Sequence, residues 1–124
     1  MDNADIEDMF SALGPVSIRR MFGGKGIYYH GVIIALDLFE EILLKADAET
    51  APKFEEAGAR QWTYQREGKK PVAMPYWSIP DDAFDDPDVM AKWVTLAYEA
   101  GFRTHKPSAK KVSAKKRQNR FGES

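Results

Sequence analysis

The residues with the clearest chemical potential form one short stretch of the chain. Arg19 and Arg20 run directly into the segment Met21-Phe22-Gly23-Gly24-Lys25-Gly26. Guanidinium groups bind carboxylates and phosphates through paired hydrogen bonds, and glycine-rich backbone can form an anion-binding concavity. The stretch is therefore a candidate anion contact; in the simpler alternative, one arginine is an ion-pair partner within a sheet. Its candidate residues are Arg19, Arg20, Phe22, Gly23, Gly24 and Lys25.

The glycine pattern does not match the motifs that bind nucleotides. Both the P-loop and the dinucleotide fingerprint need a helix directly after their glycines. Here the next residues, Ile27-Tyr28-Tyr29, are typical of a strand. Because Arg19 and Arg20 are adjacent in a strand, their side chains should point to opposite faces of a sheet.

Tyr76 and Trp77 are a further candidate contact, because aromatic side chains near a sheet edge can line a groove for a ligand or peptide. The alternative is that they pack in the core. The two residues are neighbours in an extended segment, so we expect them on opposite faces and one of them partly exposed. Prolines at 71, 75 and 80 predict that part of this segment lies at a sheet edge.

The residues most often used in catalysis and metal binding are sparse. The chain has no cysteine and two histidines, His30 and His105, which are far apart in the sequence. The acidic run over residues 81–88 lacks the calcium-loop pattern, and we interpret Asp86 before Pro87 as a helix start. We expect no catalytic residue, no cofactor and no metal site.

Charge divides the chain into two parts. Residues 1–102 carry ten Lys or Arg and eighteen Asp or Glu, a net −8, whereas residues 103–124 carry eight Lys or Arg and one Glu, a net +7. We expect a folded domain over 1–103 and a disordered basic tail over 104–124, because the tail has few apolar residues. The tail either binds nucleic acid nonspecifically by counterion release or only aids solubility. Its candidate residues are Lys106, Lys110, Lys111, Lys115, Lys116, Arg117 and Arg120.

The order of the expected elements predicts an α+β fold. Consecutive strands joined by short connections favour antiparallel pairing. We expect two layers, one antiparallel sheet of about five strands with helices packed on it, in the order α-β3-α-β2-α. The elements are a helix through Ile6, Met9 and Phe10, strands over 16–29, 32–36 and 42–46, a helix after Thr50, strands over 62–65 and 72–79, and a helix from Asp86 to Gly101.

Three segments of the chain resemble the TfoX N-terminal domain family. They are Arg19 to Tyr28 (R-R-M-F-G-G-K-G-I-Y), Leu44 to Asp47 (L-K-A-D) and Pro71 to Trp77 (P-V-A-M-P-Y-W), and the resemblance covers roughly residues 7–102. It implies a two-layer α+β fold like that of secretion chaperones. It also implies a link to bacterial regulators of competence for DNA uptake, which are transcriptional co-regulators, and no enzyme activity.

These observations favour a non-catalytic regulatory or adaptor domain that acts by protein contact, with nonspecific DNA binding through the tail. The partner is another protein or a second copy of the chain. The alternative is a small-molecule-binding or anion-binding domain, or a cryptic enzyme, that uses the glycine bend. We expect a soluble cytoplasmic protein, because the N-terminus lacks an apolar signal region and the longest apolar run, residues 32–36, is too short to span a membrane.

Overall fold

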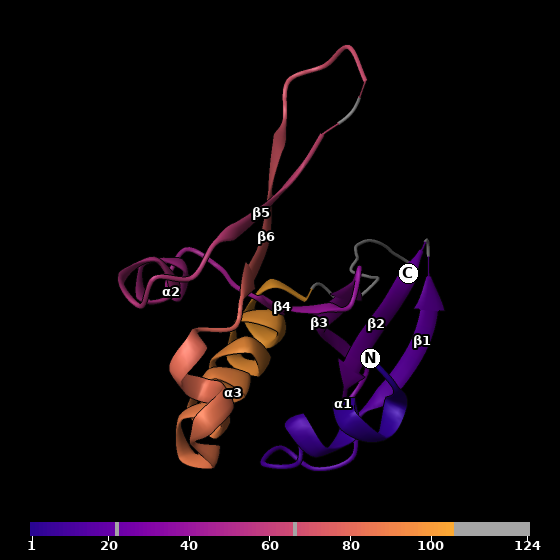
Figure 1. Ribbon diagram of the computed structural model, residues 1–124, viewed down its shortest axis with the longest axis vertical. Helices are drawn as coiled ribbons and strands as arrows, with labels where there is room; N and C mark the ends of the chain where they lie inside the picture. Colours follow the sequence, from indigo (N-terminus) through magenta and orange to yellow (C-terminus); the bar gives the residue numbers. More distant parts are fainter. Residues whose placement is uncertain (22, 66, 106–124) are drawn as a thin grey trace, which may run out of the picture.

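A six-stranded antiparallel sheet organises the chain (Figure 1). The computed structural model describes residues 1–21, 23–65 and 67–105. Along the chain the elements are α1 (Asn3–Met9), β1 (Ser17–Met21), β2 (Gly24–Tyr29), β3 (Val32–Leu38), β4 (Glu41–Lys45), α2 (Ala51–Glu56), β5 (Gln61–Tyr64), β6 (Val72–Ser78), a 3-10 helix η1 (Asp81–Asp85) and α3 (Pro87–Thr104).

The strands lie in the order β1-β2-β3-β4-β6-β5, and each neighbouring pair is antiparallel. This confirms the predicted α+β class with helices packed on an antiparallel sheet. The sheet has six strands because residues 16–29 do not form one interrupted strand. The chain reverses at Gly23, whose φ is +69°, so that β1 pairs with β2 as a hairpin.

The main core lies between the helices and one face of the sheet. Ile6 of α1, Phe54 of α2 and Val94 of α3 are fully buried there. Ile27 and Leu44 reach the same core from the sheet. A β-bulge in β3 adds a further residue to this core. Ile27 of β2 pairs with Ala35 and the next residue pairs with Ile33, so Ile34 has no partner on β2. Ile34 is fully buried.

The opposite face of the sheet carries a second, smaller apolar cluster whose members all come from strands. Leu36, Leu43 and Tyr76 are buried at its centre, although no helical residue belongs to the cluster. We call this surface the open face. Its residues are Met21, Ile33, Leu36, Leu38, Leu43, Trp62, Met74 and Tyr76.

The β5–β6 hairpin extends beyond the rest of the sheet (Figure 1). Strand β6 lies between β4 and β5, but only its second half, Tyr76 to Ser78, pairs with β4. Val72 and Ala73 pair with β5 alone. The prediction that part of this proline-rich segment lies at an edge is therefore confirmed for its first half.

Helix α3 begins as the sequence predicts and ends later. The Asp86 carboxylate accepts hydrogen bonds from the backbone N–H groups of Asp88 and Val89, and Pro87 follows it as the first helical residue. Gly101 does not end the helix, which continues to Thr104. A Cβ on Gly101 would lie 2.7 Å from the carbonyl oxygen of Ile33, so this glycine instead lets α3 lie directly on β3.

Candidate functional site

Two adjacent glycines shape the hairpin between β1 and β2. Gly23 reverses the chain in the left-handed conformation that glycine tolerates best. Gly24 passes so close to β3 that a Cβ would overlap the carbonyl oxygen of Asp37 and approach Leu38 Cδ2 at 2.6 Å. Neither residue supplies a reactive group, so their contribution to a site is the position of the backbone.

Gly26 leaves room for an aromatic ring on the open-face side of β2. A Cβ on Gly26 would lie 3.0 Å from Tyr28 Cε1 and 3.1 Å from Met21 Sδ. The Tyr28 ring therefore lies over the Gly26 backbone instead of standing away from the sheet. The ring then forms a flat surface on which Arg19 of β1 rests.

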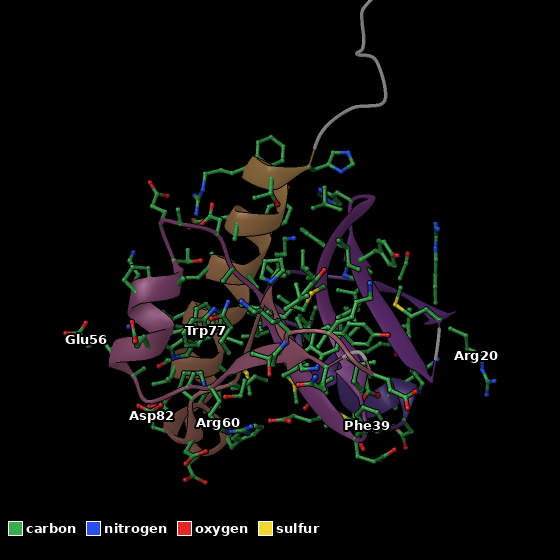
Figure 2. The ribbon with its side chains drawn as sticks, turned by 90° about the horizontal axis from the view of Figure 1, so that it is seen from above. Arg20, Phe39, Glu56, Arg60, Trp77 and Asp82 are labelled. Atoms are coloured by element: carbon green, nitrogen blue, oxygen red, sulfur yellow. The ribbon has the colours of Figure 1, made fainter. Side chains whose placement is uncertain are left out.

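Arg19 and Arg20 point to opposite faces of the sheet, as their adjacency in β1 predicts. The guanidinium carbon of Arg19 lies 5.0 Å from the centroid of the Tyr28 ring on the open-face side. Arg20 lies at the other side, beside Ile18, and its side chain extends away from the sheet (Figure 2). The structure therefore divides the predicted anion contact into two separate places.

A cavity of about 360 Å³ lies at the end of the β1–β2 hairpin. It brings together four residues of the predicted set, Arg20, Gly23, Gly24 and Lys25, with the β3–β4 turn; Phe22 lies outside the described residues. Its lining is Met1, Arg20, Met21, Gly23, Gly24, Lys25, Asp37, Phe39 and Glu40.

The charges in this cavity are of both signs. The Lys25 ammonium donates hydrogen bonds to the carbonyl oxygen of Met1 (2.9 Å) and to Asn3 Oδ1 (2.8 Å). The α-amino group of Met1 lies 2.7 Å from the Glu40 carboxylate and 3.5 Å from that of Asp37. The hydrogen bond from this amino group lowers the pKa of Glu40. Within the described part of the chain, Arg20 is the one charged side chain of this cavity with neither a hydrogen bond nor an ion pair.

Tyr76 and Trp77 lie on opposite faces, but the expectation that one of them is partly exposed was wrong. Tyr76 is 7% exposed and Trp77 is 8% exposed. The open face is packed by its own side chains, and Trp62 lies edge-on to Tyr76 with ring centroids 6.5 Å apart. Trp77 stacks with Phe54 of α2 in the main core, where its indole Nε1 has no hydrogen-bond partner.

Lys45 is a site residue that the sequence analysis missed. Its ammonium lies 5.0 Å from the centroid of the Tyr76 ring. Burial lowers the pKa of Lys45, whereas the nearby Asp47 carboxylate opposes that change. Burial also raises the pKa of the Tyr76 hydroxyl, and the neighbouring Tyr28 adds to this effect. The signal for Lys45 was its alternation with Leu43 in β4, which places both on one face.

The open face is hollowed between the β3–β4 turn and β5. A cavity of about 230 Å³ is lined there by Leu38, Leu43 and Trp62, with Arg60 at its border. Arg60 forms an ion pair of 2.7 Å with Glu41. Leu38 and Leu43 thus form an apolar floor in this hollow, and the side chains of Trp62 and Arg60 border it.

The remaining sequence predictions fall on other parts of the chain. Lys106, Lys110, Lys111, Lys115, Lys116, Arg117 and Arg120 lie outside the described residues. Over residues 1–21, 23–65 and 67–105, no three or more His, Asp or Glu residues are grouped so that they could hold a metal ion. In the same part of the chain, no helix combines the length and apolar character needed to cross a membrane.

Comparison with known proteins supports the resemblance noted in the sequence. The family model described as the TfoX N-terminal domain matches residues 8–101. The match therefore extends from within α1 to the last turn of α3 and includes the β1–β2 hairpin and the open face. In the comparison with curated proteins, nothing matches the chain.

Proposed function

The chain belongs to the TfoX N-terminal domain family, and on that premise we propose that it is a non-catalytic regulatory or adaptor domain that acts by contacting another protein. Membership relates the chain to regulators of competence for DNA uptake. Contact with a partner is the mode of action that the exposed surfaces of this domain support best. The proposal places that contact on the open face.

The composition and shape of the open face carry the proposal. Its rim combines Trp62, Met74 and Met21, which are all partly exposed. Tryptophan, methionine, tyrosine and arginine are enriched in protein interfaces, and a few aromatic residues usually carry most of the binding energy. An apolar floor with aromatic and methionine side chains at its rim therefore suits a protein segment.

The basic tail supports a second part of the proposal, nonspecific DNA binding. The net +7 of residues 103–124 contrasts with the net −8 of residues 1–102. Each phosphate that a cation neutralises releases counterions, so affinity of this kind falls steeply with salt. The tail would then hold the domain near DNA while the open face binds a protein partner.

The cavity at the β1–β2 hairpin favours an alternative function, the binding of a small molecule. Arg20 lines this cavity without an ion pair to a described residue. Asp37 and Glu40 line the same cavity, so a simple anion would meet like charges there. A small zwitterion fits this arrangement better, and an increase in melting temperature with such a ligand would support the alternative.

Site-specific photo-cross-linking tests the proposed protein contact. A photoreactive amino acid at Tyr64, which lies beside Trp62 and is 47% exposed, samples the open face. The same amino acid at Glu56, exposed on α2 (Figure 2), is the matched control. We expect one discrete cross-linked protein from position 64 and not from position 56. Identical products at both positions, or none at position 64, would contradict the proposal.

A further inference from the structure

Two cations lie on the open face in the same unusual arrangement. Arg19 rests on the Tyr28 ring and Lys45 on the Tyr76 ring, each 5.0 Å from the ring centroid. Within the described residues, neither cation forms an ion pair or a hydrogen bond. The Asp47 carboxylate, whose charge acts on Lys45, is already held by two hydrogen bonds from Arg103.

Lys45 is partly buried and lacks the ion-pair partner that a charge in such a place needs, whereas Arg19 is exposed in the free domain. The Lys45 ammonium is partly desolvated, and desolvation disfavours the charged form. A tyrosine ring attracts a cation by about 0.5–2 kcal/mol, which compensates desolvation less than a carboxylate does. A purely apolar partner covering this face would remove more water from both cations. A partner that brings carboxylates to them avoids that penalty.

We infer that the open face binds an extended, acidic and apolar segment of a partner protein, with one carboxylate on Arg19, one on Lys45 and an apolar side chain between them. The inference rests on the proposed function, because it names the kind of partner that the open face takes.

The sheet register supports this spacing. Arg19 is aligned through Gly26 with Leu36 and Leu43, and Lys45 lies two residues beyond Leu43 in β4. β1 and β4 are three strand spacings apart, about 14 Å. With the two-residue offset along β4, the backbones at Arg19 and Lys45 are about 16 Å apart. An extended chain covers about 14 Å in four residues, and the long side chains of Arg19 and Lys45 can span the remainder. Residues i, i+2 and i+4 of such a chain share one face. The matching pattern is therefore an acidic residue, an apolar residue and an acidic residue at alternate positions.

Single-stranded nucleic acid is the competing occupant, since cations and aromatic rings on a sheet also bind bases. Stacking needs a free ring face, but Arg19 and Lys45 each occupy a tyrosine face, and Tyr76 is almost fully buried. Residues 1–102 carry a net charge of −8, which repels other anions. This repulsion is stronger for a nucleic acid, with one negative charge per nucleotide, than for a protein segment with two carboxylates.

A titration of the full chain with synthetic peptides, followed by NMR, tests the inference. The probe is a capped peptide with the core Glu-Ser-Leu-Ser-Glu. Its counterparts have Gln for Glu, or Ser for Leu, and a twelve-residue oligothymidine represents nucleic acid. We expect the Glu peptide to shift the signals of Trp62 and Tyr76. It should bind about 25-fold to 100-fold more tightly than the Gln peptide, which loses both charge-assisted contacts, and about tenfold more tightly than the Ser peptide, which loses the buried apolar side chain.

Variants of the two cations provide the second measurement. Arg19→Gln and Lys45→Met are each expected to weaken the Glu peptide about fivefold to tenfold and to leave the Gln peptide unchanged. Lys92→Met is the matched control, because Lys92 lies 5.0 Å from the Trp93 ring centroid on α3, outside the open face. It should not change the affinity.

The outcomes separate this inference from the proposed function. Equal binding of the Glu and Gln peptides at the open face would overturn the acidic preference and leave the protein-contact function intact. Tighter binding of oligothymidine to this face would overturn the inference in favour of nucleic acid. If no peptide shifts the open-face signals, or if the shifts lie elsewhere, both the inference and the proposed site of contact are contradicted.

Discussion

Arg103 in the last turn of α3 holds the carboxylate of Asp47, which follows β4, through two hydrogen bonds. Arg103 Nε lies 2.6 Å from Oδ2, and Nη2 lies 3.1 Å from Oδ1. The same carboxylate accepts hydrogen bonds from the N–H groups of Glu49 and Thr50 at the start of α2. Asp47 therefore joins the end of the sheet, α2 and the end of α3, next to Lys45.

Acid should weaken this junction in a defined pH range. The hydrogen bond from Arg103 is the largest of the effects that hold the pKa of Asp47 at about 2, below its ordinary 3.8. Because the pKa of Asp47 is lower in the folded state, the ionised carboxylate stabilises the fold above pH 4. This stabilisation is lost as the pH falls from about 4 to 2. Urea unfolding should show a loss of about 1–2 kcal/mol in this range, allowing for the partial exposure of Arg103. In Asp47→Asn this loss should be absent.

The ion pair between Arg60 and Glu41 is the control for that measurement. Both side chains are exposed, although their charged atoms are 2.7 Å apart. Glu41→Gln should therefore change the free energy of unfolding by less than about 0.5 kcal/mol. A loss of about 1–2 kcal/mol, as large as that expected when Asp47 is protonated, would show that the structure does not distinguish the two pairs.

Gly24→Ala should destabilise the fold more than Gly31→Ala, because only Gly24 has backbone atoms in the place of a Cβ. A Cβ at Gly24 would overlap the backbone of Asp37, which cannot move without disrupting β3. We expect a loss of about 3 kcal/mol in chemical denaturation. At Gly31, where φ is +79° and no atom lies within 4 Å of a Cβ, alanine should cost only about 1–2 kcal/mol. Equal losses would contradict the close approach of β2 and β3.

Phe39 should be replaceable with a gain in stability. It has a φ of +54° in the β3–β4 turn and is 89% exposed, so it stores backbone strain and contributes little packing. Phe39→Gly should raise the free energy of unfolding by about 0.5–1 kcal/mol. Phe39→Val should lower it, because a β-branched residue is poorly suited to this conformation. A loss with glycine would show that the ring stabilises the fold.

The tail prediction concerns charge and can be tested in the full chain. Replacing the seven cations of the tail with glutamine should remove most of the affinity for duplex DNA. These cations are Lys106, Lys110, Lys111, Lys115, Lys116, Arg117 and Arg120. In the unmodified chain the logarithm of affinity should fall with the logarithm of salt concentration with a slope of about −6. A slope that the substitutions leave unchanged would reject DNA binding through the tail.

The sequence predicted local features well because they depend on neighbouring residues. The start of α3 follows from Asp86 before Pro87, and the opposite directions of Arg19 and Arg20 follow from their adjacency. The hairpin at Gly23 could not be distinguished from a bulge, since adjacent glycines permit both. The sheet has six strands because the chain forms a hairpin at Gly23, in which β1 pairs with β2.

The candidate site was less predictable because it depends on register between distant strands. Lys45 meets Tyr76 through the pairing of β4 with β6, which are separated in sequence by α2 and β5. Glycine is common at helix ends, so the local sequence at Gly101 predicts one, whereas the contact of Gly101 with β3 requires the packing of α3 on the sheet. Such relationships are visible only once the elements are placed together.

The most direct test of contact through the open face uses the partner identified by cross-linking, purified as a separate protein. Calorimetry measures its affinity for surface variants of the full chain. We expect Trp62→Ser combined with Met74→Ser to weaken binding at least about a hundredfold, as loss of an aromatic anchor in an interface does. Glu56→Lys on α2 should leave the affinity unchanged. Unaltered affinity in the open-face variant, with its fold intact, would contradict the central claim.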